Sequence, residues 1–306
     1  MQKNKITVNL FKTSQIHGYL AFLFLILVAS IIKSLSSGLR SNKLSTHQLI
    51  KIIVAESWNT YVHFDGEEQY PNMKRIFEQI YNYTLLKYYI ATKISLKNSL
   101  FYKGKIGRIF YLEQELGTKT QPFVIFQLKS FNLTEEDTYD INMINPISGD
   151  TYTFTAKRDV VERSKQKNRV DSDYCIVGGF VKSSGKGKNP EFISLGVLPV
   201  NQNGVVIESS YEKKLYDLLC EKKRLFQRPI NAKYHPKWDG LVPDGLLIDT
   251  QPHTIIEVFG MSEDHIDYHL HREYKIKHYE SIVDSYRLWY WDAFKDSNIP
   301  TLPLQR

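Results

Sequence analysis

The alternation of apolar and polar positions divides the chain into a helical first part, a strand-rich middle and a mixed last part. Between residues 46 and 100 the apolar residues recur at helical spacing. These positions are Leu49, Ile52, Ile53 and Ala55, and then Ile76, Ile80, Leu85 and Leu86. From about Ile106 onward the pattern changes to that of strands.

The middle of the chain predicts an antiparallel sheet. Residues 123–131 (FVIFQLKSF) are a buried-strand run, and residues 139–157 alternate around a turn centred on Ser148, Gly149 and Asp150. A second pair of strands, 174–183 and 191–200, flanks the turn sequence SSGKGKNP.

From Ile207 the predicted order is helix, strand, strand, strand, helix, strand. A helix opens at Ser209, and FQRPI is a short strand. Strands over Leu241–Ile248 and Thr254–Gly260 come next, then a helix over 264–286 and a closing strand, RLWYWD. The expected fold class is therefore α+β: a helical N-terminal region, an antiparallel β middle domain and a C-terminal α/β module. We expect three parts, 1–45, 46–205 and 206–306.

Two acidic residues stand out in the C-terminal strands. Asp244 follows Pro243 in LVPDGLLI, and Glu257 lies in the apolar run TIIEVFG. A carboxylate inside an apolar strand is costly to bury unless a partner compensates it. If the two strands pair, Asp244 and Glu257 meet at one strand end, where oxygen ligands suit a hard cation such as Mg²⁺.

This arrangement of residues 205–295 resembles the PD-(D/E)xK nuclease superfamily, which has the restriction-endonuclease-like fold. The resemblance rests on the element order, on Pro243-Asp244, and on Glu257-Val258-Phe259. It implies metal-assisted hydrolysis of phosphodiesters, with Mg²⁺ or Mn²⁺ held by Asp244, Glu257 and Val258. In that superfamily a Lys follows the acid by two positions, whereas this chain has Phe259 there.

Some members take the lysine from the following helix instead. In this chain Tyr268, Arg272, Lys275 and Tyr279 fall on one helical face. Lys275 is the candidate catalytic lysine and Lys277 the second choice, while Glu212 matches the acid that the first helix often adds.

Structural interpretations of the same residues remain open. Pro243-Asp244-Gly245 is also a common turn sequence, and Glu257 would equally form a buried ion pair with Arg272 or Lys275. Ser209 and Glu212 have the spacing of a helix capping box, and the Lys275 stripe would also suit a solvated face.

A longer span, about 45–225, is similar to an uncharacterised bacterial family of plasmids and mobile elements, domain of unknown function family 1173. The similar segments are HQLIKIIVAESWNTY, PFVIFQLKSFN, YCIVGGFVKSSG and SSYEKKLYDLL. Members of that family begin with a Cys-containing segment, where this chain has an apolar stretch.

Charge adds a candidate partner. The net charge of +7 and the pI near 9.1 favour a polyanion, and the resemblance makes that partner DNA. The candidate DNA-contacting residues are Lys182, Lys186 and Lys188 in the basic turn, and Arg272 and Lys277 on the late helix. Two cysteines, Cys175 and Cys220, are too few for a disulfide framework, which predicts a reducing, cytoplasmic location.

The N-terminal apolar stretch leaves several alternatives. Residues 13–32 carry no charge and are densely apolar from Tyr19 to Ile32. This length fits a short membrane span, a signal-peptide core, a buried helix or a non-native start of the reading frame.

The leading hypothesis is a Mg²⁺-dependent DNA endonuclease of a mobile element. The alternatives are a non-catalytic DNA-binding protein on a decayed nuclease scaffold, motivated by Phe259, and a conjugation accessory protein anchored in the membrane through residues 13–32.

Overall fold

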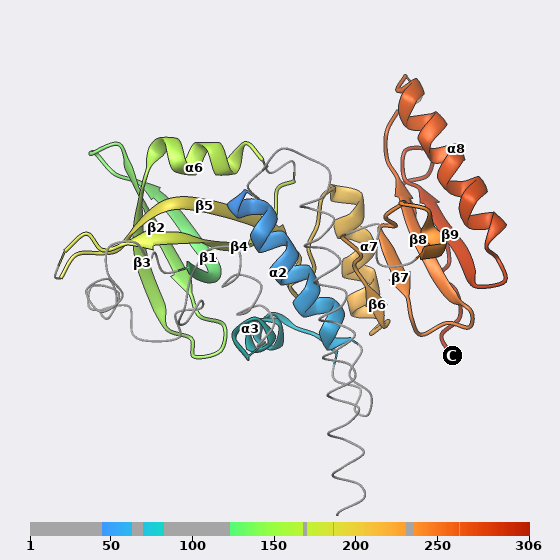
Figure 1. The fold of residues 1–306 in the computed structure, drawn as a ribbon, viewed down its shortest axis with the longest axis horizontal. Coiled ribbons are helices and arrows are strands. Elements are labelled where there is room, and N and C mark those ends of the chain that lie inside the picture. Colours follow the sequence, from blue (N-terminus) through green and yellow to red (C-terminus); the bar gives the residue numbers. More distant parts are fainter. Residues whose placement is uncertain are drawn as a thin grey trace, which may run out of the picture.

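The computed structural model describes residues 45–62, 70–82, 123–167, 170–185, 187–230, 236–262 and 264–306. The apolar segment 13–32 and the predicted helical positions Leu85 and Leu86 lie outside these ranges. Within the described ranges, no helix has the length and apolar character needed to cross a bilayer. Figure 1 shows the elements in order, with the barrel and the C-terminal sheet at opposite ends and helix α2 between them.

Two helices come first in the described chain, α2 (Thr46–Tyr61) and α3 (Met73–Asn82). The buried side chains of α2 include Ile50, Ile53, Val54 and Trp58, which recur at the spacing expected for one helical face. This face packs into a core cluster that continues through the barrel wall and into the C-terminal part.

The middle of the chain forms a closed five-stranded barrel. Its strands are β1 (Phe123–Leu133), β2 (Thr138–Ile144), β3 (Thr151–Lys157), β4 (Tyr174–Lys182) and β5 (Glu191–Val200), with α6 (Arg158–Lys165) between β3 and β4. The order around the barrel is β1-β2-β3-β5-β4, and β1 pairs with β4 in its first half and with β2 in its second. This is the topology of the OB-fold, a barrel that in many proteins binds oligonucleotides.

Every second side chain of strand β2 points into the barrel and helps to fill it. In β2 the side chains of Tyr139, Ile141 and Met143 are buried, and the intervening ones are partly exposed. These three side chains belong to one buried hydrophobic cluster together with Phe154, Phe192 and other residues of the barrel. The predicted sheet is confirmed as β-structure, with two differences: β3 and β5 pair in parallel, and α6, which the sequence did not predict, follows β3 directly.

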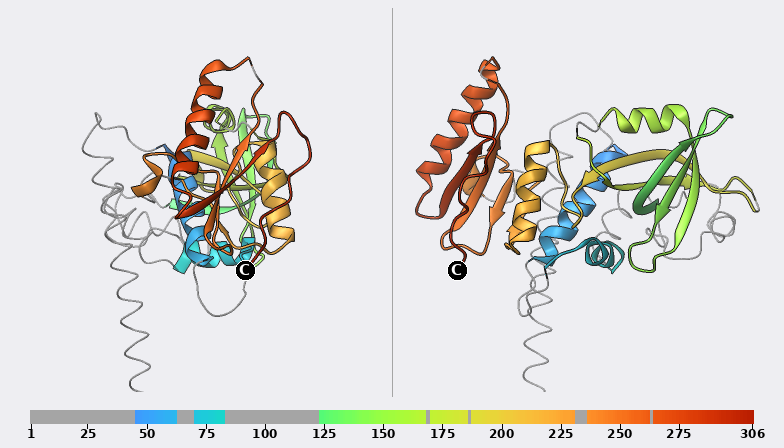
Figure 2. Two further views of the ribbon diagram at one scale, coloured as in Figure 1. Left: turned by 90° about the vertical axis from the view of Figure 1, so that its right-hand side faces the viewer. Right: turned by 180° about the vertical axis from the view of Figure 1, so that it is seen from behind.

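The last part is a four-stranded mixed sheet between two helices. Its elements are α7 (Ser210–Glu221), β6 (Phe226–Gln227), the 3₁₀ turn Pro236–Trp238, β7 (Gly245–Leu247), β8 (His253–Phe259), α8 (Ile266–Ser281) and β9 (Tyr286–Asp292). The strand order is β6-β7-β8-β9, antiparallel except for β8 and β9, which α8 connects. Figure 2 shows α8 on the outer face of this sheet and α7 on the inner face, toward the barrel.

The expected order of elements after Ile207 and the α+β class are confirmed. The strand predicted over Leu241–Ile248 is shorter, because only Gly245–Leu247 pairs with its neighbours.

Helix α2 joins the two halves of the molecule. The Trp58 indole Nε1 donates to the carbonyl oxygen of Phe226 at 3.0 Å. The Asn59 side chain accepts from the backbone N–H of Arg228 at 2.7 Å and donates to its carbonyl at 2.9 Å. The Asn59 amide thus satisfies both backbone groups of Arg228, just after β6, as a neighbouring strand would. One hydrophobic cluster includes residues from both sides of the expected domain boundary near residue 205.

Close approach of α2 to the barrel requires a glycine in β5. A Cβ atom added at Gly196 would lie 2.7 Å from Ile50 Cδ1 and 2.9 Å from the His47 backbone. We expect Gly196→Ala to destabilise the protein by about 1–3 kcal/mol, because the helix backbone must move outward. Urea unfolding followed by circular dichroism measures this, and an unchanged midpoint would contradict the packing described.

Candidate active site on the C-terminal sheet

The pairing of β7 with β8 brings the two predicted acids together. Gly245 pairs with Ile256 in the antiparallel ladder, so the preceding residue, Asp244, stands opposite Glu257. Directly opposite residues of an antiparallel pair share a face of the sheet. Asp244 and Glu257 therefore lie on one face, the one that α8 covers.

The carboxylate of Asp244 is held by the neighbouring strand. The backbone N–H of Val258 donates to Asp244 Oδ2 at 2.8 Å. No other hydrogen bond reaches this carboxylate from the part of the chain that the structure describes. One oxygen of Asp244 is thus fixed, and the described residues leave the second one open to a ligand.

Glu257 forms an ion pair with the predicted lysine. Lys275 Nζ lies 2.8 Å from both Glu257 Oε1 and Oε2, and it also donates to the carbonyl of Val242 at 3.1 Å. The Glu257 side chain is 2% exposed and that of Lys275 14%. Burial and the negative charge of Asp244 together raise the pKa of Glu257 to about 8, although the Lys275 ammonium opposes the shift.

The predicted stripe on α8 faces the sheet rather than solvent. Tyr279 is fully buried, and Lys275 and Arg272 are mostly covered. Burial and the nearby charge of Glu257 raise the pKa of Tyr279, and its buried hydroxyl has no hydrogen-bond partner among the residues that the structure describes. This geometry suits both a buried ion pair with Glu257 and a catalytic lysine.

Phe259, two residues after Glu257, stands where the resemblance leads us to expect a lysine. Its ring packs against Tyr268 and Tyr290, and the Arg272 guanidinium lies 4.9 Å above it. Phe259 therefore anchors α8 to the sheet, and the ammonium of Lys275 reaches Glu257 from that helix.

Glu212 takes part in capping the N-terminus of α7, as its spacing from Ser209 suggested. Ser209 Oγ accepts from the Glu212 N–H at 3.0 Å, and Glu212 Oε2 accepts from the Glu208 N–H at 3.0 Å. The same oxygen lies 3.2 Å from Arg228 Nη2. Burial raises the pKa of Glu212 to about 7, with Arg228 opposing the shift and Asp244 adding to it.

Arg228 is a central residue of this site that the sequence analysis did not identify. Its side chain is 4% exposed, and its Nη2 pairs with Glu208 at 2.9 Å as well as with Glu212. Its Nη1 donates to the carbonyl of Asp244 at 3.1 Å, and the Tyr216 hydroxyl donates to the same carbonyl at 2.6 Å. Two buried donors thus fix the backbone of Asp244. No local pattern indicates this role, because FQRPI reads only as a short strand.

The remaining predicted DNA-contacting residues lie far apart. Lys182 pairs with Glu191 at 3.0 Å, Lys188 is exposed in the β4–β5 loop, and Lys186 lies outside the described ranges. Arg272 pairs with Asp292 at 2.9 Å, and Lys277 is exposed on α8. Figure 1 places the β4–β5 loop and α8 at opposite ends of the molecule, so these residues form two groups rather than one patch.

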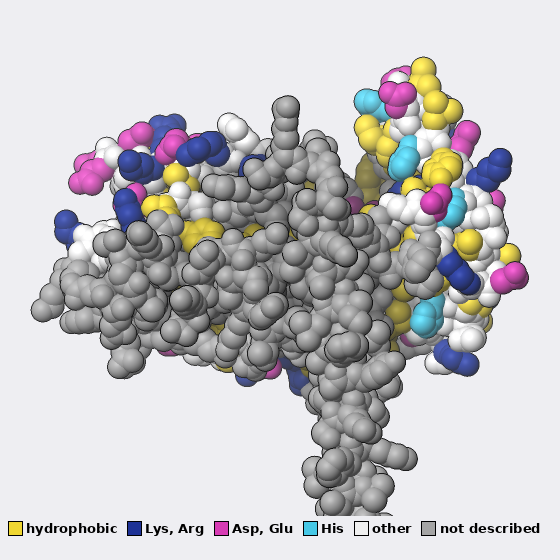
Figure 3. Space-filling view, in the orientation of Figure 1, with side chains coloured by type: hydrophobic (Ala, Val, Ile, Leu, Met, Phe, Trp, Pro, Cys, Tyr) yellow, Lys and Arg dark blue, Asp and Glu magenta, His cyan; other side chains and the backbone are white. Residues whose placement is uncertain are grey.

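The described residues do not carry an excess of Lys and Arg over Asp and Glu. Residues 1–44 contain Lys and Arg but no acidic residue, and in 83–122 Lys and Arg outnumber Glu, so the positive excess lies in ranges that the structure does not describe. Figure 3 shows hydrophobic, histidine and mixed charged side chains over α8. The charge argument for DNA therefore does not apply to the described surface.

The oxygen donors at Asp244 and Glu257 suit Mg²⁺ or Mn²⁺ in type. Within the described ranges, no three His, Cys, Asp or Glu side chains gather closely enough to form a metal site by themselves. Two carboxylates and the carbonyl of Val258 would have to be completed by water or by substrate oxygens, as is usual for Mg²⁺. Cys175 and Cys220 are both free thiols.

Comparison with known proteins adds no assignment to this geometry: the chain matches no protein-family model and no curated protein at a significant level.

Proposed function

We propose that this protein is a metal-dependent DNA endonuclease that hydrolyses phosphodiester bonds. The observation that carries the proposal is the antiparallel register that sets Asp244 opposite Glu257, with Lys275 Nζ 2.8 Å from both Glu257 oxygens. The resemblance to the PD-(D/E)xK superfamily and the helix, three strands, helix, strand order support it.

Each residue has a role in this proposal. Asp244, Glu257 and the carbonyl of Val258 would hold Mg²⁺, which supplies an activated water and charge neutralisation at the phosphate. Lys275 orients the attacking water or stabilises the leaving oxygen, since its ammonium already lies in the site. Arg228 and Tyr216 hold the backbone of Asp244, and Glu212 joins them through Arg228.

The barrel supplies a second argument for nucleic acid. In OB-folds the loop between strands 4 and 5 is one of the regions that contact oligonucleotides. Here β4 ends at Lys182, and the loop that follows carries Lys188. We propose that it contacts the DNA backbone, and the likeness to proteins of plasmids and mobile elements suggests the setting.

A second candidate is a DNA-binding protein without catalysis on the same scaffold. It is favoured by Phe259 at the usual lysine position and by the pairing of both Glu257 oxygens with Lys275, which a metal would have to displace. Salt-sensitive DNA binding without cleavage at any metal concentration would support this candidate.

The proposal is tested with the full chain and plasmid DNA. We expect nicking or linearisation in Mg²⁺ or Mn²⁺, none in EDTA, and a loss of about a thousandfold in Asp244→Asn and Glu257→Gln. The Asp140→Asn variant, on the outer face of the barrel strand β2, serves as the matched control and should cut normally. Cleavage by the two acid variants at the wild-type rate would overturn the assignment.

A further inference from the structure

Strand β9 forms an open edge of the C-terminal sheet. Among the strands that the structure describes, only β8 pairs with it, along all seven residues of Tyr286–Asp292. The outer side of an edge strand carries a row of N–H and C=O groups to which another strand can bind. Because β9 contains no proline, its edge offers an uninterrupted template for strand pairing.

The register of β8 and β9 determines which backbone groups of β9 face outward. Just after β9, the N–H of Ala293 donates to the carbonyl of Phe259 at 2.7 Å, so the odd-numbered residues of β9 bond to β8 in this parallel ladder. The N–H and C=O groups of Leu288 and Tyr290 therefore point away from β8. Within the described part of the chain, no residue binds these outward groups.

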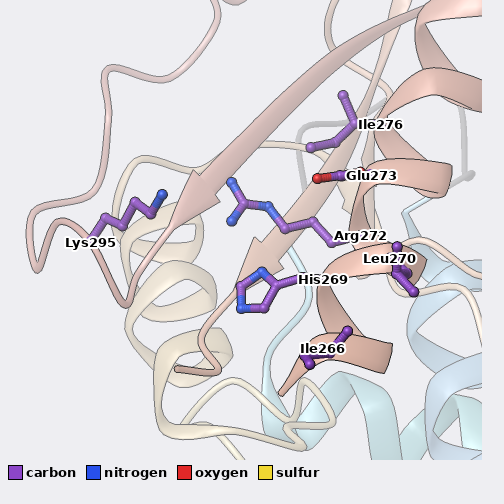
Figure 4. Close-up of a pocket in the computed structure, with 7 residues that line it drawn as sticks. All are labelled: Ile266, His269, Leu270, Arg272, Glu273, Ile276 and Lys295. Atoms are coloured by element: carbon purple, nitrogen blue, oxygen red, sulfur yellow. The ribbon is translucent and has the colours of Figure 1, made fainter. Parts of the chain in front are cut away.

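One flank of α8 lies on the side of this open edge. On the other flank, toward β7, Tyr274 donates to Asp239 at 3.2 Å. His278 on that same flank lies 2.8 Å from the carbonyl of Lys237, in the turn before β7. The opposite flank borders a hollow of about 440 Å³, which Lys295 after β9 closes on its far side (Figure 4). The hollow therefore lies beside the open edge of β9.

Large apolar side chains are exposed around the same edge. They are Ile266 and Leu270 of α8, Tyr290 of β9 and Phe294 just after it, with 71%, 60%, 41% and 50% of their surfaces exposed. Ile266 and Leu270 line the hollow itself, together with Ile276. An unpaired strand edge that is flanked by exposed apolar side chains is typical of a protein interface.

The charges beside the edge are mixed in sign. Glu273 lines the hollow together with His269, Arg272 and Lys295, and Asp292 pairs with Arg272 at 2.9 Å. Two carboxylates thus accompany the two cationic side chains, Arg272 and Lys295. This balance does not favour a polyanion, and it suits a protein surface that itself carries both signs.

We propose that β9 pairs with β9 of a second copy of this chain, antiparallel about a twofold axis at Trp289, and so joins two C-terminal sheets into one. A second copy fits because the edge is self-complementary: the outward groups of Leu288 and Tyr290 lie symmetrically on either side of Trp289. In this register Leu288 and Tyr290 of the second copy exchange both backbone hydrogen bonds. The two α8 helices then lie on the same face of the joined sheet, with their apolar flanks turned toward each other.

Sedimentation velocity of the full chain over a range of concentrations tests this interface. We expect a species with twice the chain mass of 35.8 kDa, which dissociates on dilution. The measurement contains no DNA and no metal. Its result therefore does not depend on whether the protein is a nuclease, and failure of either proposal leaves the other standing.

Paired variants of Tyr290 test the position of the interface. In the proposed register the two Tyr290 side chains lie on one face and diagonally across from each other, about 7–8 Å apart, within reach of long side chains. Tyr290→Lys and Tyr290→Glu should each weaken self-association by about tenfold or more, because each places two like charges together. An equimolar mixture of the two variants should form a heterodimer, because the charges are then opposite.

The matched control is Leu133→Lys, which puts the same charge on a similarly exposed apolar residue at the end of the barrel strand β1. It should self-associate as the wild type does. A wild-type chain that stays monomeric at about 0.1 mM would overturn the proposal. So would wild-type self-association in Tyr290→Lys, an equal loss in Leu133→Lys, or a mixture of the two Tyr290 variants without heterodimer.

Discussion

Lys275→Met is expected to lower metal-dependent DNA cleavage by about 10²- to 10³-fold while leaving a folded protein. The ammonium lies in contact with both oxygens of Glu257, so its removal would take away the cation that the proposed mechanism uses beside the phosphate. It also leaves Glu257 buried without its partner, which should cost about 1–3 kcal/mol of stability, since protonation relieves part of the charge burial. Cleavage rates and urea unfolding measure the two effects.

The double variant Lys275→Met with Glu257→Gln tests whether Lys275 acts on Glu257 as an ion-pair partner in addition to its proposed catalytic role. A neutral Gln opposite Met no longer buries an unpaired charge, so the double variant should be more stable than the sum of the two single changes by about 1 kcal/mol or more. Cleavage by the double variant should be no faster than cleavage by either single variant. If Lys275→Met cuts at the wild-type rate, Lys275 is a structural partner of Glu257 and not a catalytic residue.

The largest loss of stability is expected for Arg228→Met, at about 3–5 kcal/mol. The guanidinium is buried and pairs with Glu212, so its removal leaves a buried acid without a cation. The carbonyl of Asp244 also loses one of its two donors, so metal-dependent cleavage should fall together with stability.

Two further variants show which property of Arg228 matters. Arg228→Lys keeps the charge but not the planar fork, so we expect an intermediate loss. Glu208→Gln removes the half-exposed partner of the same guanidinium and should change the free energy of unfolding by no more than about 0.5 kcal/mol. An equal loss in Glu208→Gln and Arg228→Met would mean that the network as a whole, rather than the buried pair, stabilises the site.

Local pattern alone predicted most of the helices and strands and singled out the two acids, Asp244 and Glu257. In strands such as β2 the buried and partly exposed positions alternate, and in α8 the covered residues Arg272, Lys275 and Tyr279 lie three to four positions apart, so each element could be predicted from the printed sequence. The same arithmetic placed Lys275 on the face of α8 that carries Tyr279. It missed α6, because RDVVERSK is short and polar and buries only Val161 and Ser164.

Contacts between distant residues could not be predicted in this way. Closure of the barrel depends on two residue pairs between β3 and β5, and nothing within either strand indicates the partner. The role of Arg228 arises because Asn59, Glu208 and Asp244 meet around it, although long stretches of chain separate Asn59 from the other two.

The sequence by itself determined the order of all the described helices and strands except α6, and the residue types that the candidate site contains, because backbone geometry imposes fixed periods on each element. The tertiary structure alone decided which acid faces which cation: Glu257 pairs with Lys275, Glu212 with Arg228, and Arg272 with Asp292. The physical reason is that a buried charge must find a partner wherever packing brings one, and packing joins residues that no local spacing connects.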